Sequence, residues 1–259
     1  MGKKAKISFS LLAMLAALTY FVMSSNIISE KEGEHRCNDF NITVNEANER
    51  LLVTQEDVKS ILLNSSLNIL SEPIKNVDVH AIEELLLSKS YIKNAEVYTD
   101  INGTLNIRIE QRKPIIRINT KGSGFYIGED GFVFPLSKSF TDYVPIVTGN
   151  VPLPFSIGYK GEIPDAESAS FIKTILDFAR FLQNDSYWNS MIEQVHVVNE
   201  NDVELITRVG SHVVKLGNFD SYKYKLHKLD VFYRNGMPSV GWNTYKTINL
   251  EYSNQVVCK

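Results

Sequence analysis

The chain has 259 residues, of which 44% are hydrophobic and 22% are charged. This composition is ordinary for a globular protein and is sufficient for one large domain or two small ones. The formal net charge of -3 gives no electrostatic basis for binding nucleic acid, so we expect no nucleic-acid partner.

The first part of the chain has an uneven distribution of charge. The only charged side chains before Glu30 belong to lysines at the very start, and the apolar range 7–29 carries no charge. At about 1.5 Å per residue, a helix of this length spans a bilayer core of roughly 30 Å. The sequence therefore predicts a cytoplasmic tail at 1–6, a transmembrane signal anchor at 7–29 and a polar linker at 30–36. A cleaved signal peptide is the alternative, although its apolar part is normally shorter.

The next part of the chain begins with the signals of one strand and two helices. Residues 40–44 alternate between apolar and polar side chains, as in a half-buried strand. Thr54 and Asp57 have the spacing of a capping box, followed by apolar residues at helical spacing. Asp78 can cap a second helix. These signals predict the order strand, helix, helix.

A hairpin is predicted to follow the two helices. The ranges 95–99 and 105–111 flank an Asn-Gly pair at 102–103, which is typical of a tight hairpin turn. Pro114 ends the last strand because proline cannot donate to the ladder. Residues 37–113 are thus predicted to form a small β-α-α-β-β domain.

The remaining residues, 114–259, predict a β-rich domain with two amphipathic helices that begin at Asp165 and Asp220. Strands are expected at 114–118, 125–127, 132–134, 193–198, 202–208 and 211–217, and a long closing strand at 246–258. The expected fold class is α+β, with a single N-terminal transmembrane helix before the two domains.

The sequence offers no recognisable catalytic or metal-binding motif. It contains no GxSxG, P-loop, HExxH or Rossmann glycine pattern, and its histidines are not paired at i, i+4. We therefore expect no enzyme activity, no cofactor and no metal. Cys37 and Cys258 could form a disulfide or remain separate thiols, and two separate thiols are favoured.

Several segments together resemble the FtsQ/DivIB family of bacterial division proteins. Ala95-Glu96-Val97 and the sequence EQRKP at 110–114 resemble the end of the family's POTRA domain. GFYIGEDGFVFPLS at 124–137, YVPIVTG at 143–149 and KTINLEYSNQVVCK at 246–259 resemble later family segments in the correct order. The resemblance covers essentially all of 37–259, so it implies a POTRA domain at 37–113 and an FtsQ-type β domain at 114–259.

The resemblance implies a division scaffold in the bacterial cytoplasmic membrane, located at the septum, with most of the chain in the periplasm. The implied partners are small single-span division proteins of the FtsB and FtsL type and, through them, the septal peptidoglycan synthase. A partner strand could add to the sheet edge formed by the closing segment. The candidate contact residues are Thr247, Ile248, Asn249, Leu250, Glu251, Tyr252, Ser253, Asn254, Gln255, Val256 and Val257, with Leu250 and Tyr252 as anchors.

Two other functions stay open at this point. One is that of another envelope POTRA protein, acting in protein export or assembly. The other is an enzyme whose site has no familiar motif, which convergent titratable groups in a pocket would indicate. Within the POTRA domain, partner recruitment and a simple spacer role are both open.

Overall fold

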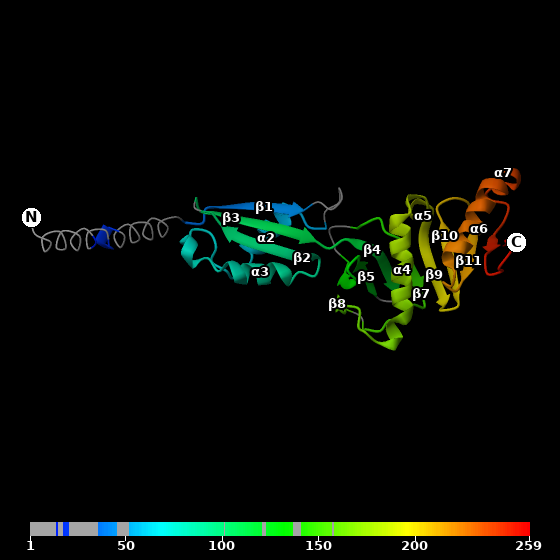
Figure 1. Cartoon of the computed structure of the whole chain (residues 1–259), viewed down its shortest axis with the longest axis horizontal. Helices are drawn as coiled ribbons and strands as arrows, with labels where there is room; N and C mark the ends of the chain where they lie inside the picture. The colour runs from blue at the N-terminus through cyan, green and yellow to red at the C-terminus, as the bar shows by residue number, and fades with distance from the viewer. Residues whose placement is uncertain are drawn as a thin grey trace, which may run out of the picture. The chain divides into compact units, whose positions relative to one another are not determined.

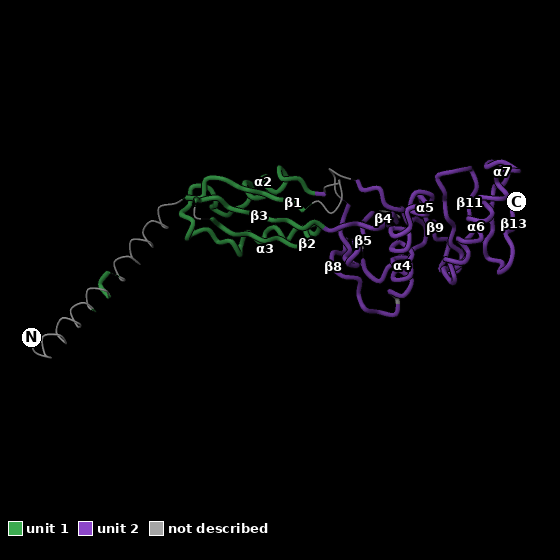
Figure 2. Tube along the Cα trace, turned by 45° about the horizontal axis from the view of Figure 1, so that its top comes forward, with its two compact units in different colours: residues 1–46, 53–111 green, residues 47–52, 112–259 purple. Residues whose placement is uncertain are grey.

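The computed structural model describes residues 14, 18–20, 36–45, 52–100, 102–120, 123–136, 141–156 and 158–259. The chain divides into two compact units (Figure 2). Unit 1 contains Met1–Glu46 and Val53–Gln111, and unit 2 contains Ala47–Leu52 and Arg112–Lys259.

The predicted transmembrane helix at 7–29 requires correction. Of this range the structure describes residues 14 and 18–20, and among all described residues no helix has both the length and the apolar character needed to cross a membrane. The fold class of the described residues is α+β. The predicted tail at 1–6 and nearly all of the linker at 30–36 lie outside the described residues.

Unit 1 is a three-stranded sheet with two α-helices (Figure 1). Its elements are β1 (Asp39–Asn45), α2 (Gln55–Leu63), the short 3-10 helix η1 (Ile74–Asn76), α3 (Val79–Leu87), β2 (Ile92–Thr99) and β3 (Thr104–Gln111). The strand order is β1-β3-β2, with β1 parallel and β2 antiparallel to β3. The β-α-α-β-β order predicted for this part of the chain is therefore present.

Local capping explains where the helices of unit 1 begin. The Thr54 hydroxyl accepts a hydrogen bond from Asp57 N at 3.1 Å, and the Asp57 carboxylate accepts one from Thr54 N at 2.9 Å. Asp78 accepts from Ala81 N at 3.0 Å and caps α3. Alternate residues of β3 (Leu105, Ile107 and Ile109) are buried, so one face of the sheet packs into the core.

Unit 2 is built on a ten-stranded mixed sheet in the order β13-β12-β11-β10-β9-β7-β4-β5-β6-β8. Its first strands are β4 (Pro114–Thr120), β5 (Ser123–Gly128), β6 (Phe132–Pro135), β7 (Ile146–Gly149) and β8 (Gly161–Glu162). The later strands are β9 (Ile192–Asn199), β10 (Asp202–Thr207), β11 (Val213–Gly217), β12 (Thr247–Asn249) and β13 (Val257–Cys258). The helices are η2 (Glu167–Ala169, a 3-10 helix), α4 (Ser170–Asn184), α5 (Ser186–Met191), α6 (Tyr222–Asn235) and α7 (Met237–Val240).

The two long helices of unit 2 share one core with one face of the sheet. The core contains Ile172, Ile175 and Phe178 of α4, and it also contains Leu226 and Leu229 of α6. Strands β9 to β12 contribute alternate residues to this core. These residues are Val195, Val197, Val203, Leu205, Val214, Leu216 and Ile248. The intervening residues of these strands form the other, half-buried face.

The other face of the sheet carries a polar row that runs across neighbouring strands. The register aligns Thr148 with His196, His196 with Glu204, and Glu204 with Lys215. Thr148 Oγ1 lies 3.0 Å from His196 Nδ1, and Lys215 Nζ lies 3.4 Å from Glu204 Oε1. The sheet is therefore apolar on the helix face and polar in this row.

The predicted helix starts at Asp165 and Asp220 are wrong in detail. Helix α4 begins after Ala169, and Asp165 instead accepts a hydrogen bond from Lys173 at 2.7 Å. Helix α6 begins after Ser221, while the Asp220 carboxylate accepts from the Asn218 amide at 2.6 Å. Each carboxylate has a competing side-chain donor nearby, which the spacing rules for caps do not include.

The charged residues that directly follow β3 in the sequence, Arg112 and Lys113, belong to unit 2. The Arg112 guanidinium contacts the Asp130 carboxylate and lies 3.5 Å from the centroid of the Phe132 ring. Lys113 Nζ lies 3.8 Å from Glu129, and Pro114 is the first residue of β4, where its missing N–H costs no ladder bond. The charges that follow β3 thus fix the turn between β5 and β6.

Candidate functional site

The closing segment (residues 246–259) forms one end of the unit 2 sheet. β12 pairs in parallel with β11, and β13 pairs antiparallel with β12. The long strand predicted at 246–258 is wrong, because residues 250–256 separate two short strands. The edge of the sheet is consequently β13, which consists of Val257 and Cys258.

A side-chain turn explains why the predicted strand is interrupted. The Asn249 side-chain carbonyl accepts from Glu251 N at 2.8 Å, and its amide donates to the Glu251 carboxylate at 2.7 Å. Asparagine bonds of this kind compete with a strand ladder and favour a turn. Gly217 permits the close approach, since it has φ +73° and a Cβ there would lie 2.8 Å from Glu251 Cγ.

The register shows which backbone groups face outward at the edge. Thr247 and Lys259 exchange both hydrogen bonds, at 3.1 Å and 3.0 Å. The next pair, Ile248 and Cys258, is therefore a non-hydrogen-bonded pair of the antiparallel ladder. The N–H and C=O of Cys258 point away from β12, where the described residues provide no further strand. An outward-facing N–H and C=O at a sheet edge are the groups to which an added strand would bond.

Helix α6 and the closing segment line an open groove of about 600 Å³ beside this edge. It is lined by Tyr224, His227, Lys228, Val231, Phe232, Asn235, Gly236, Asn254, Gln255 and Val256. Tyr224 and Val231 are 49% and 45% exposed, so the groove offers apolar surface next to unpaired backbone groups. A strand that adds at β13 could place alternate side chains there.

The predicted contact residues have very different accessibility. Ile248 and Leu250 are fully buried, so the Leu250 side chain is a core residue and is not accessible as an anchor in the folded chain. Tyr252 is 50% exposed. The exposed residues are Glu251, Tyr252, Ser253, Asn254 and Gln255, whereas Thr247, Asn249, Val256 and Val257 are half-buried.

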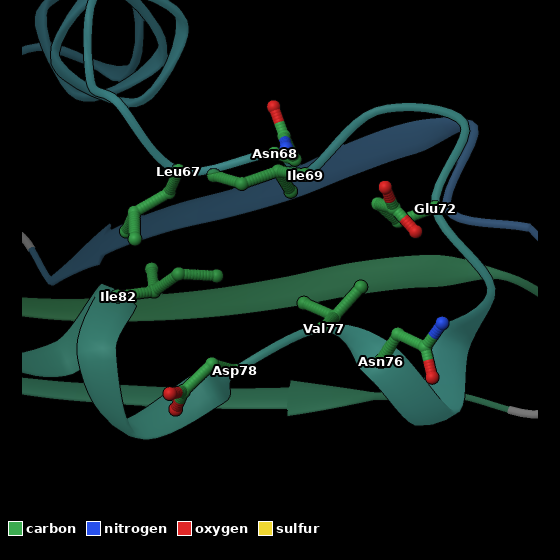
Figure 3. A pocket seen from close by; sticks show the side chains of 8 residues that line it. All are labelled: Leu67, Asn68, Ile69, Glu72, Asn76, Val77, Asp78 and Ile82. Atoms are coloured by element: carbon green, nitrogen blue, oxygen red, sulfur yellow. The ribbon is translucent and has the colours of Figure 1, made fainter.

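A second hollow lies in unit 1 and measures about 320 Å³ (Figure 3). It is lined by Leu67, Asn68, Ile69, Glu72, Asn76, Val77, Asp78 and Ile82. The Asp78 carboxylate is already used in capping α3, which leaves Glu72 as the other acidic group around an apolar floor. This arrangement has no nucleophile–base pair of the kind that catalysis requires.

The two cysteines are free thiols in the structure. Cys37 is buried in unit 1 and Cys258 is half-buried in unit 2, and burial raises the pKa of both thiols. The interpretation of two separate thiols stays a prediction. In the described parts of the chain, no three His, Cys, Asp or Glu residues are grouped as a metal site would require.

Comparison with known families identifies the region that contains the edge and the groove. Residues 113–259 match the family described as "FtsQ/DivIB, C-terminal related". The chain belongs to the FtsQ/DivIB family. Residues 35–110 match a POTRA-like domain. The resemblance drawn from the sequence segments is confirmed.

One curated relative is the "Cell division protein FtsQ" of Geotalea daltonii. It is 26% identical to this chain over 184 residues, which is 70% of this chain. The aligned part spans 63% of the relative's own length.

Two features of the site were not predicted from the sequence. The half-buried Lys228 reaches three carbonyl oxygens of the closing segment, and Cys258 supplies the outward-facing backbone. The sequence does place Lys228 on one helical stripe with Tyr224 and Val231. This spacing is also ordinary for a lysine on the surface of a packed helix, so it does not by itself indicate a role for Lys228.

Proposed function

We propose that this chain is a non-enzymatic scaffold of bacterial cell division that binds partner proteins through unit 2. The carrying observation is that the β13 edge and its adjacent groove lie within the residues matched to the FtsQ/DivIB family. The cell-division name of the Geotalea daltonii relative supports the same role.

In this proposal, a partner segment adds as a strand beside β13. The outward N–H and C=O of Cys258 supply main-chain affinity, and the groove lined by α6 supplies specificity for alternate side chains. The proposed direct partners are small division proteins of the FtsB and FtsL type. The septal peptidoglycan synthase would be reached through them.

The proposed site of action is the periplasmic side of the cytoplasmic membrane at the division septum. The POTRA-like unit is proposed to recruit further division proteins to that place. The alternative role in protein export or assembly is supported by the POTRA-like match alone, whereas the match over residues 113–259 favours division.

Photo-crosslinking in living cells tests the proposed interface. A photoreactive amino acid is placed singly at each accessible position between Thr247 and Val257, and adducts are identified by mass spectrometry. Ile248 and Leu250 are left unchanged because both are fully buried and replacement would disturb the core. We expect adducts with a small single-span division protein at the exposed positions 251–255 and at Val257.

The matched control carries the same probe at Asn201, an exposed residue in the turn between β9 and β10. We expect no adduct with the small division protein from that position. If the whole closing segment gave no such adduct while the chain remained folded and septal, the proposed interface would be wrong.

A further inference from the structure

Lys228 connects α6 to both sides of the turn in the closing segment. Its ammonium group donates to the carbonyl oxygens of Leu250 at 3.0 Å and Gln255 at 3.4 Å, and also to that of Tyr252. Leu250 precedes the turn and Gln255 follows it. A single cation therefore binds the two arms of the β12–β13 hairpin and its tip.

The chemistry of lysine suits this arrangement. An ammonium group carries three donors and no acceptor, and hydrogen bonds from a charged donor are roughly twice as strong as neutral ones. The carbonyls of residues 250–255 lie outside the ladder between β12 and β13. Burial lowers the pKa of Lys228 from its ordinary value, as expected when a cation exchanges water for protein carbonyls.

We infer that Lys228 is the positioning residue that holds the β13 edge in place for strand addition. This inference rests on the proposed function of that edge. β13 has two residues, so its ladder with β12 is short. Fixing residues 250–255 against α6 sets where Val257 and Cys258 lie. A preformed edge also lowers the entropy that a partner must overcome on binding.

The test compares three variants of the full chain with the wild type. Lys228→Met keeps an unbranched apolar stem and removes the donors, while Lys228→Arg keeps a cationic donor at the same place. Lys223→Met is the matched control, because Lys223 is an exposed residue of the same helix whose ammonium lies 5.7 Å from the Phe181 ring.

Amide hydrogen exchange is the first readout. In Lys228→Met we expect exchange of residues 246–259 to rise at least tenfold, with β9 and β10 unchanged. Lys228→Arg and Lys223→Met should retain wild-type protection. Unchanged protection of residues 246–259 in Lys228→Met would overturn the inference. If that variant failed to fold, a tenfold or greater rise in the folded Lys228→Arg chain would also overturn it.

Crosslinking in cells is the second readout, with a photoreactive amino acid at the exposed Ser253. We expect the adduct with the small division protein to fall at least fivefold in Lys228→Met and to persist in the other two variants. An unchanged adduct together with raised exchange would also overturn the inference, since the edge would then need no positioning. Absence of the adduct from every position of the wild-type chain would instead show that the proposed function itself has failed.

Discussion

His212 is a buried titratable side chain with polar partners on two sides. It is 2% exposed, its Nε2 lies 2.6 Å from Tyr233 Oη, and its Nδ1 lies 3.4 Å from the carbonyl of Trp242. These contacts join the start of β11 to the last turn of α6 and to the loop after α7. Burial lowers the pKa of His212 and raises that of Tyr233, so the neutral pair is the stable form.

The lowered pKa of His212 predicts that the protein loses stability in acid. The unfolded chain, with a histidine pKa of about 6.5, binds more protons than the folded chain below that value. The stabilisation is complete above about pH 6.5 and is lost as the pH falls towards the folded-state pKa. The free energy of unfolding, measured by urea denaturation, should therefore be lower at pH 5.0 than at pH 7.5.

A matched variant isolates the contribution of this side chain. Glutamine in His212→Gln can still bond to Tyr233 but does not titrate. We expect it to be less stable than the wild type at pH 7.5, with a smaller difference in the free energy of unfolding between the two proteins at pH 5.0. Parallel stability curves for the two proteins would show that His212 does not cause the pH dependence.

At the scale of elements, the β12–β13 hairpin contains both core residues, which stabilise the fold, and exposed residues, which face the solvent. Leu250→Ala should lower the free energy of unfolding of unit 2 by about 2–5 kcal/mol, because the leucine is fully buried. Tyr252→Ala should cost less than about 0.5 kcal/mol, because half of that side chain is exposed. Urea unfolding of both variants checks this contrast. Equal losses would mean that Tyr252 also belongs to the core.

The elements of unit 1 were largely predictable because local signals determine them. The Thr54–Asp57 capping box and the Asp78 cap are both present, and Gly103 has the positive φ of +93° expected in a tight turn. Each signal acts over a few residues, and the tertiary packing favours the same local structure.

Unit 2 was less predictable because its sheet depends on distant pairings. β7 lies between β4 and β9 and is parallel to both, which no local pattern specifies. Leu250 was predicted as a partner anchor but is fully buried, as is Ile248. The bonds between Asn249 and Glu251 end the strand that was predicted to continue through these residues. The site residue Lys228 was missed because its role depends on carbonyls more than twenty positions away.

At the scale of the whole molecule, each unit has its own sheet and its own buried residues. The ten-stranded sheet and the core cluster of unit 2 both lie within residues 112–259. We therefore expect a chain that lacks residues 37–111, which include the short range 47–52 assigned to unit 2, to retain that folded sheet and core. Thermal unfolding of that chain should show a unit 2 transition within about 2 °C of its position in the full chain. A shift of more than about 5 °C would show that the units depend on each other for stability.

The same deletion tests the proposed role of the POTRA-like unit. Fluorescently tagged chains with and without residues 37–111 are compared for accumulation at the septum. We expect the deletion to abolish septal accumulation although unit 2 stays folded. Full accumulation of the shortened chain would support a spacer role instead of recruitment.

The shortness of β13 has a consequence for how long a complex lasts. Cys258 is the residue of this two-residue strand whose backbone faces outward, so pairing with β13 itself uses the N–H and C=O of one residue. At about 0.5–1.5 kcal/mol per hydrogen bond, this pairing supplies roughly 1–3 kcal/mol, less than the ~4 kcal/mol of a millimolar complex. Residence time must then come from side chains in the groove beside α6. A contact divided in this way is released when either the main-chain pairing or the side-chain contact is lost.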